Sequence, residues 1–234
     1  MQPEMMPTFD QQCEVIQSTY TDTYSVYDII LDEDIREPSY YRQALHTLRT
    51  ANENDVVQIF LNNSGGQLDT AICFRNSIQE CRAPVFAILE GDTHSAAGMI
   101  ALSCDDVIAK PYCAMMVHNA SFGSAGTSQN IVDHVSFISK QTERLVREVY
   151  KDFLTKSEID EVVKNREIWL TDEEIKARWG YVVEARKDAQ LEPEDGEIVD
   201  SEEDFYEEVT KANPVTHRDI TSLELPAVWP EKLK

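Results

Sequence analysis

The hydrophobic pattern between Tyr24 and Ala185 switches repeatedly between the period of a strand and the period of a helix. Short apolar runs typical of buried strands occur at 27–31, 56–61, 84–89, 107–109 and 114–117. Helical segments are predicted at 40–50, at 68–78 and at the alanine-rich 95–103. A turn is predicted at 90–93, where Gly91 interrupts the apolar run. This alternation predicts an α/β fold with a mainly parallel sheet.

A longer pattern begins at Ser128, where one amphipathic helix is predicted to run to Leu154. Its apolar stripe consists of Ile131, Val135, Ile138, Leu145, Val149 and Phe153. The predicted helix is more than twice as long as an average globular helix. We therefore expect it to extend beyond its own domain and to contribute to a subunit interface. The alternative is a helix that lies across its own sheet.

The charge and the cysteines narrow the class of protein. The chain has 234 residues, with 43 Asp and Glu against 21 Lys and Arg, and its net charge of −22 repels nucleic acid and anionic membranes. No apolar run approaches the length of a membrane span, and the first twenty residues lack the features of a signal peptide. The five cysteines show neither a disulfide pattern nor metal-binding spacing. We expect a cytoplasmic protein, or one in the host cytoplasm if a virus encodes it, without a metal site.

Half of the acidic excess is concentrated in residues 188–208, which contain 11 acids and no Lys or Arg. Such a segment buries too little apolar surface to offset its chain entropy, so we expect it to be solvated. The sequence is therefore divided into an N-terminal segment of residues 1–24, a folded domain of residues 25–187 and an acidic C-terminal extension of residues 188–234.

A glycine pair follows the predicted strand at 56–61. Gly65 and Gly66 permit positive φ and can present bare N–H groups to a ligand. An ordinary turn between a strand and a helix is the alternative. A phosphate loop is not indicated, because no Gly-Lys-Ser/Thr sequence follows.

Two further residues suited to chemistry follow later predicted strands. Ser95 lies where a strand meets a helix, so its hydroxyl would lie near unpaired N–H groups that begin with that of Ala96. A plain helix N-cap is the alternative for Ser95. His118 leaves an apolar strand and could act as a general base, or could be structural. Because parallel strands end at one edge of a sheet, we expect these residues and the glycine pair to converge.

These segments, in this order, resemble the proteolytic subunit of the Clp protease, a serine peptidase of the crotonase-like superfamily. The family's Asn-Ser-Pro-Gly-Gly, Gly-x-Ala-Ala-Ser and Met-Ile-His motifs are similar to residues 62–66, 91–95 and 116–118. Its closing pattern, Arg-Asp-x-Phe-Leu-Ser-x-x-Glu-Ala-x-x-x-Gly, is similar to residues 166–180. The resemblance covers residues 25–185 and implies repeated β-β-α units with a long protruding handle helix.

The resemblance implies a catalytic triad with Ser95 as the nucleophile and His118 as its base. The third member falls on Glu167, where the family has Asp, because a carboxylate is needed there to orient the imidazole and stabilise its cation. Asp133 and Asp172 are the alternative acids.

The resemblance also implies the groups that hold the substrate. The oxyanion would be bound by the N–H groups of Ala96 and of either Gly65 or Gly66. An extended peptide would pair with a strand at 120–126, which contains the substrate-contacting residues Ala120, Phe122, Gly123, Ser124 and Ala125. His94, which replaces a small residue, either narrows the site or pairs with Asp92. Trp169 and Trp179 are expected to serve packing.

By resemblance, the function is that of a self-compartmentalising serine endopeptidase made of two stacked rings. A Clp-type AAA+ ATPase would feed it polypeptides, and no metal or organic cofactor would be needed. The first 23 residues would occupy the place of the family's axial loops. Two alternatives stay open: a catalytically silent ring subunit in which the Glu167 geometry fails, and an acyl-CoA enzyme of the crotonase type. The lack of carboxylates beside Gly65, Gly66 and Ala96 argues against the latter.

Overall fold

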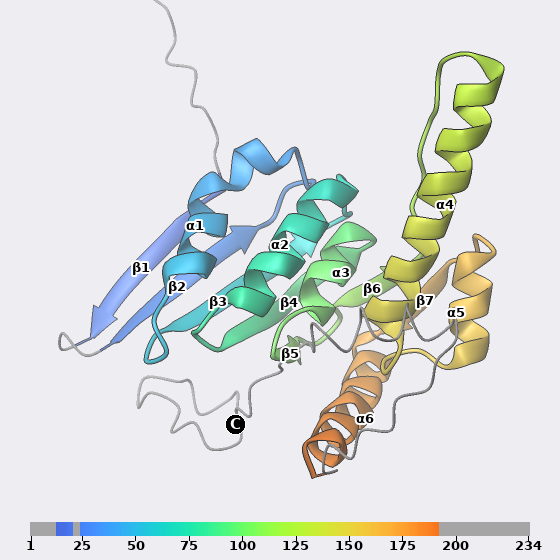
Figure 1. The fold of residues 1–234 in the computed structure, drawn as a ribbon. Helices are drawn as coiled ribbons and strands as arrows, with labels where there is room; N and C mark the ends of the chain where they lie inside the picture. The colour runs from blue at the N-terminus through green and yellow to red at the C-terminus, as the bar shows by residue number, and fades with distance from the viewer. Residues whose placement is uncertain (1–12, 21–23, 192–234) are drawn as a thin grey trace, which may run out of the picture.

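Strands from across the chain form one mixed sheet in the computed structural model, which describes residues 13–20 and 24–191 (Figure 1). The strands are β1 (Val15–Tyr20), β2 (Tyr24–Leu31), β3 (Val56–Asn63), β4 (Val85–His94), β5 (Asp106–Ala109), β6 (Ala114–Val117) and β7 (Ile168–Thr171). Their order is β1-β2-β3-β4-β6-β7, and β5 pairs with β4. The inner pairs are parallel, whereas β1–β2 and β6–β7 are antiparallel. The predicted α/β fold with a mainly parallel sheet is confirmed.

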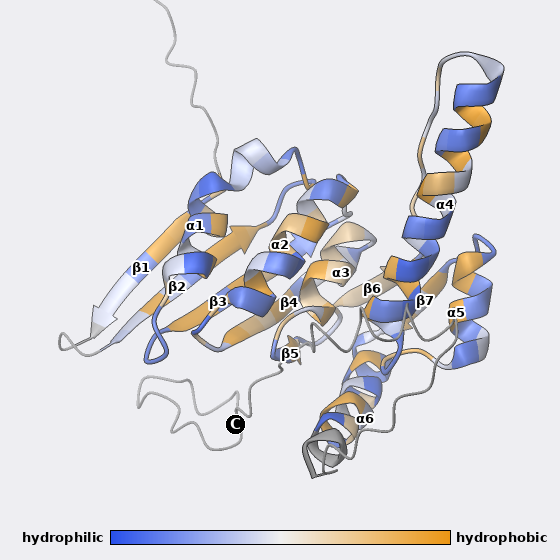
Figure 2. Ribbon diagram, viewed as in Figure 1, coloured by the Kyte–Doolittle hydropathy of each residue, from blue (hydrophilic) through white to orange (hydrophobic). Residues whose placement is uncertain are grey.

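Helices α1, α2 and α3 lie side by side over one face of this sheet, and the remaining long helices lie toward its β6–β7 end (Figure 1). The helical elements are η1 (Pro38–Tyr41), α1 (Arg42–Thr50), α2 (Leu68–Glu80), α3 (Ala96–Leu102), α4 (Ser128–Tyr150), α5 (Lys156–Val163) and α6 (Asp172–Leu191). Alternate residues of β3, namely Val57, Ile59 and Leu61, are fully buried, and every residue of α3 is buried. Figure 2 shows the apolar residues on the strands and on the inner sides of these helices. This packed core holds β4 and the start of α3 in place.

The turn predicted at residues 90–93 is wrong, because β4 continues without interruption to His94. Residues 86–89 of β4 pair with β5, and residues 92–94 pair with β6. Gly91 serves close approach rather than a turn, since a Cβ atom added there would lie 2.3 Å from Asn62 Oδ1. The N–H group of Asp92 donates to the same oxygen at 3.2 Å. The extra length of β4 carries Ser95 to the end of β6.

The ends of the folded unit differ from the predicted segments. Strand β1 lies within the predicted N-terminal segment but pairs along its length with β2, from Val15↔Ile29 to Tyr20↔Tyr24. Its consecutive polar residues Gln17, Ser18 and Thr19 suit an edge strand, which has only one neighbour. Helix α6 continues to Leu191, beyond the predicted boundary at residue 187. The rest of the acidic extension and residues 1–12 and 21–23 of the axial-loop segment lie outside the described residues.

The predicted long helix is α4, which ends at Tyr150 rather than at Leu154. Its second half packs on the core through Thr142, Val146 and Tyr150, which are buried. Its first half extends away from the sheet (Figure 1) and exposes large apolar side chains, with Val132 61% and Phe137 59% exposed. The predicted interface role of this half stays a prediction.

Two further features of the described residues concern membrane-spanning helices and the cysteines. None of the helices in this part of the chain is long and apolar enough to cross a membrane. All five cysteines are free thiols. Burial raises the pKa of Cys13 to about 12, so this thiol stays protonated and unreactive at neutral pH.

Candidate active site

Ser95 lies between β4 and α3 in a backbone conformation that few residues other than glycine adopt. Its φ is 55° and its ψ is −118°. The Ser95 N–H donates to the carbonyl of Met116 at 2.8 Å, and its own carbonyl accepts from the N–H of Met99 at 3.1 Å. Its side chain caps no helix N–H group, so the N-cap alternative is wrong. The backbone of Ser95 is thus strained. The surrounding hydrogen bonds hold it in place, and with it the hydroxyl that it carries.

His118 follows β6 directly and lies against this hydroxyl. Its Nε2 atom is 2.6 Å from Ser95 Oγ, a short hydrogen bond. The β4–β6 pairing, which matches His94 with Met116, brings the two residues together. The arrangement suits transfer of the serine proton to the imidazole.

The glycine pair lies next to Ser95. A Cβ atom added to Gly65, whose φ is 92°, would lie 2.8 Å from Ser95 Cβ and 3.0 Å from the nitrogen of Ala96. The Gly65 N–H already donates to Asn63 Oδ1 at 2.9 Å. Within the described chain, the N–H groups of Gly66 and Ala96 have no hydrogen-bond acceptor. Of the two glycine N–H groups, that of Gly66 is therefore the one without an acceptor among the described residues.

Glu167 is exposed and precedes β7 directly. Its Oε2 atom accepts a hydrogen bond from Trp169 Nε1 at 3.1 Å. Among the described residues, no carboxylate is hydrogen-bonded to His118. The β6–β7 ladder nevertheless ends with Val117 paired to Ile168, so Glu167 and His118 are each one residue beyond its last pair. Glu167 thus lies beside the histidine along the backbone while its carboxylate contacts the indole.

The two alternative acids are held by neighbours on their own helices. Asp133 accepts from Gln129 at 2.8 Å on the exposed half of α4. Asp172 pairs with Lys176 at 2.8 Å, and this hydrogen bond lowers the pKa of its carboxyl. None of the three acids is hydrogen-bonded to His118, and Glu167 is the one that directly precedes the β7 residue paired with Val117, so it remains the candidate acid.

His94 packs against Trp169 instead of reaching the serine. The two ring centroids are 5.1 Å apart in an edge-to-face arrangement. Its Nε2 atom is buried without a hydrogen-bond partner among the described residues, since Asp92 Oδ1 is 3.6 Å away. The predicted pairing with Asp92 is thus a loose ionic contact rather than a hydrogen bond.

The segment proposed to bind the peptide, residues 120–126, forms no strand with the described chain. Phe122 is 43% exposed, and a Cβ atom on Gly123 would meet no atom within 4 Å. The Ser124 hydroxyl lies 3.0 Å from Nδ1 of His134 on α4, and Ala125 is exposed. The N–H of Ala120 donates to Asn119 Oδ1 at 2.9 Å. The predicted pairing with a peptide stays a prediction.

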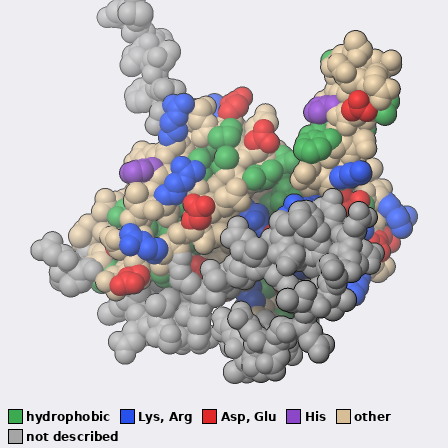
Figure 3. Space-filling model, in the orientation of Figure 1, with side chains coloured by type: hydrophobic (Ala, Val, Ile, Leu, Met, Phe, Trp, Pro, Cys, Tyr) green, Lys and Arg blue, Asp and Glu red, His purple; other side chains and the backbone are tan. Residues whose placement is uncertain are grey.

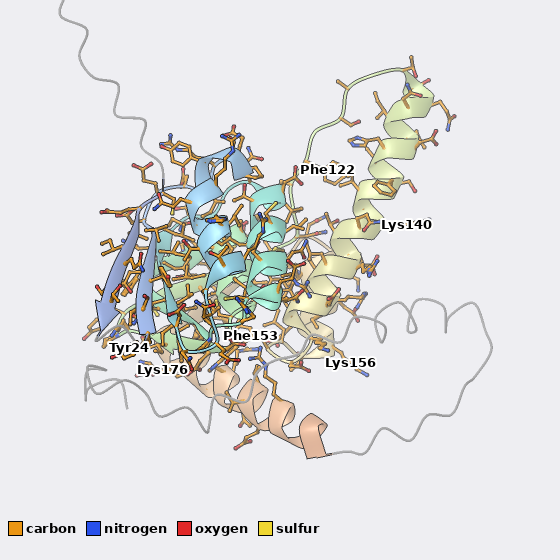
Figure 4. All side chains as sticks on the ribbon, turned by 60° about the vertical axis from the view of Figure 1, so that its left-hand side comes forward. Tyr24, Phe122, Lys140, Phe153, Lys156 and Lys176 are labelled. Atoms are coloured by element: carbon orange, nitrogen blue, oxygen red, sulfur yellow. The ribbon has the colours of Figure 1, made fainter. Side chains whose placement is uncertain are left out.

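A hollow of about 340 Å³ lies beside this segment and was not predicted from the sequence. Its walls come from the segment after His118, from α4 and from the end of α5, where Figure 4 shows Phe122 on the segment beside α4. The lining residues are Asn119, Ala120, Phe122, Ser139, Thr142, Glu143, Val163 and Asn165. The side-chain amide of Asn119 joins two of these walls by donating to the carbonyl of Val163 and to Asn165 Oδ1, both at 3.3 Å. Three regions far apart in sequence therefore form one polar hollow next to the Ser95–His118 pair.

The family model described as "Clp protease" matches residues 11–184, from before β1 into α6. A similar curated protein is the "ATP-dependent Clp protease proteolytic subunit 3" of Rhizobium meliloti (strain 1021). It is 27% identical over 137 residues, which cover 57% of this chain and 69% of the relative.

Proposed function

Because the chain belongs to the Clp protease family, as its motifs predicted, we propose that it is a serine peptidase with Ser95 as nucleophile and His118 as general base. The observation that carries this proposal is the 2.6 Å hydrogen bond between His118 Nε2 and Ser95 Oγ. The positive φ of Ser95 supports it, because backbone strain of this kind is concentrated at functional sites. The resemblance to a proteolytic subunit supports the same reaction.

The proposed reaction proceeds in two halves through an acyl-enzyme. Oγ of Ser95 bonds to the peptide carbonyl carbon while His118 takes its proton, and the carbonyl oxygen becomes an oxyanion. The free N–H groups of Gly66 and Ala96 bind that oxyanion. His118 then gives the proton to the leaving amine as the C–N bond breaks. In the second half, water bonds to the acyl carbon while His118 accepts a water proton, and His118 then passes this proton to Ser95 Oγ as the ester C–O bond breaks and the carboxylic acid product leaves.

The substrate is a polypeptide in this proposal. Residues 120–125 present backbone groups that form no strand pairing with the described chain, so an extended peptide can add along them. The hollow of about 340 Å³ beside them is large enough for one side chain of that peptide. Its asparagine, serine, threonine and glutamate walls favour a polar side chain there.

The assembly is proposed to be a pair of stacked rings in the cytoplasm, joined through the first half of α4. The exposed apolar side chains on that half support an interface, and Figure 3 shows hydrophobic groups on the arm and the adjoining surface. A partner ATPase of the Clp type is proposed from the family and from the "ATP-dependent" name of the relative.

A catalytically silent ring subunit is the second candidate. The observation that favours it is the hydrogen bond that Glu167 makes with Trp169 and not with His118. Without an aligned acid, the imidazole would lack its orienting partner and the serine would react slowly. An acyl-CoA enzyme of the crotonase type is not supported, since the family that matches this chain is that of the Clp proteases.

Labelling with a fluorophosphonate separates the two candidates. We expect wild-type protein to form a covalent adduct on Ser95, located by peptide mass spectrometry. Ser95→Ala should form none, while the control Ser157→Ala, at an exposed serine on α5, should label like wild type. An intact oligomer without an adduct would instead establish the silent subunit.

A further inference from the structure

Glu167 and Trp169 lie around the start of β7, next to the end of β6 that His118 follows. The antiparallel β6–β7 ladder ends with Val117 paired to Ile168, and His118 directly follows the first of these residues while Glu167 directly precedes the second. Trp169 lies two residues after Glu167, and residues two apart along a strand share a face. The acid and the indole are therefore both neighbours of the proposed general base.

The indole holds one oxygen of the acid and leaves the other available. Trp169 Nε1–H donates to Glu167 Oε2 at 3.1 Å. Oε1 has no hydrogen-bond partner among the described residues. One carboxylate can accept from two donors at once, because each oxygen has its own lone pairs. The bond to the indole therefore does not prevent Glu167 from serving His118.

Trp169 is fixed in place although 58% of its surface is exposed. Its ring packs edge-to-face on His94, at 5.1 Å between centroids and 72° between planes. His94 is only 9% exposed and directly precedes Ser95 in the chain. The indole is thus positioned relative to the strand that carries the nucleophile.

We propose that Trp169 is a positioning residue of this peptidase, an inference that rests on the proposed function. Its N–H group holds Oε2 of Glu167 so that Oε1 accepts a hydrogen bond from Nδ1–H of His118. When His118 takes the proton of Ser95, the carboxylate stabilises the imidazolium and itself stays ionised. Restraining the glutamate beforehand reduces the side-chain entropy lost in forming that contact.

The residue types at positions 167 and 169 support a functional coupling between these two side chains. In the pattern that residues 166–180 resemble, Asp stands at the position of Glu167 and Phe at that of Trp169. Glutamate has one more rotatable bond than aspartate and therefore needs more restraint. Phenylalanine has no N–H group and cannot supply that restraint, whereas tryptophan can. The longer acid and the added donor thus form a matched pair.

A double-mutant cycle in peptide cleavage tests this proposal. Trp169→Phe keeps an aromatic ring against His94 and removes the N–H donor. We expect kcat to fall about tenfold with KM unchanged, because a hydrogen bond to a charged group is lost away from the substrate. In a Glu167→Asp background the same change should alter kcat by less than about twofold, because the shorter acid does not depend on the indole.

Trp179→Phe is the matched control. Trp179 Nε1 also donates to a carboxylate, Asp106 Oδ1 at 2.6 Å, but between α6 and β5. We expect this variant to keep the kcat of wild type. Thermal unfolding and native mass spectrometry of all variants establish that the protein is folded and assembled before rates are compared.

The outcomes separate this proposal from the proposed function. An unchanged or higher kcat in Trp169→Phe, a change in KM alone, or equal losses with Glu and Asp at position 167 would overturn the positioning role. Each of these leaves fluorophosphonate labelling of Ser95 intact. Failure of the folded wild type to label at Ser95 would overturn the proposed function and the positioning role together.

Discussion

The two sides of the candidate site are held by different means. Ser95 and His118 follow neighbouring parallel strands, and backbone hydrogen bonds from β6 and α3 fix the serine against the imidazole. Glu167 is exposed before a four-residue strand and is held by one side-chain hydrogen bond. The nucleophile and base are thus set by the sheet itself, whereas the acid depends on a side-chain contact. Substitutions should therefore affect the two sides in different ways.

The largest effect on activity is expected from a substitution on the Ser95–His118 side of the site. His118→Ala removes the general base and should lower peptide cleavage by a factor on the order of 10⁵ or more. Steady-state kinetics on a fluorogenic peptide measures this loss. His46→Ala, which alters an exposed histidine on α1, is the control and should keep most of the activity. Comparable activity in His118→Ala and wild type would remove His118 from the site.

Substitutions of Glu167, on the other side of the site, should have a smaller effect on activity, and its size should depend on the residue introduced. Glu167→Ala should lower kcat by roughly 10³- to 10⁴-fold, since orientation of the imidazole is lost but the base remains. Glu167→Asp should retain measurable activity, because it keeps the carboxylate. The same peptide assay measures both variants. Wild-type activity in the alanine variant would show that Glu167 has no part in the reaction.

A substitution in the glycine pair beside Ser95 is expected to change the free energy of unfolding. Gly65→Ala adds a Cβ atom 2.6 Å from the carbonyl oxygen of His94 at a φ of 92°, so we expect a loss of about 2 kcal/mol. Chemical unfolding measures the change. Gly123→Ala is the control, because no atom lies within 4 Å of its added Cβ. Equal stability of both variants would show that the close packing around Ser95 is not required.

The smallest effect is expected for an ion pair outside the site. Arg178 on α6 binds both oxygens of Glu158 on α5, at 2.8 and 3.0 Å, and lowers the pKa of that carboxyl to about 2. A lowered pKa stabilises the fold above the ordinary carboxyl range of about 4.5, and this stabilisation is lost as pH falls toward 2. The pair is about one-quarter exposed, so solvent screening reduces its contribution to about 1 kcal/mol.

Comparison of wild type with Arg178→Met tests that pair. The difference in unfolding free energy should be present at pH 6 and should shrink as pH falls from 4.5 toward 2. A difference that is constant over this range would show that Arg178 acts by packing rather than by charge.

The sequence predicted the parts of the fold that depend on local pattern. The β-branched run at 56–61 and the apolar run at 84–89 indicated buried strands, and both lie in β3 and β4. Gly91 misled the prediction, because glycine marks both turns and close contacts and only the neighbouring Asn62 distinguishes them. Strand β1 was missed because its sequence lacks a clear strand period, and its strand structure depends on pairing with β2.

The candidate site was predictable where a residue type is tied to a place on a strand. Ser95 and His118 could be named because each follows an apolar strand of a parallel sheet. The choice of Gly66 over Gly65 depends on a hydrogen bond that the Gly65 N–H donates to the Asn63 side chain, which no local pattern reveals. The contact between Glu167 and Trp169 and the three-walled hollow are likewise tertiary features.

Native mass spectrometry of the fluorophosphonate-treated wild-type assembly tests the central claim most directly, because it reports the nucleophile and the assembly together. We predict that the intact oligomer gains one probe mass per subunit, and that fragmentation places this mass on Ser95. An intact oligomer that gains no mass, or a label on a residue other than Ser95, would contradict the proposed peptidase mechanism.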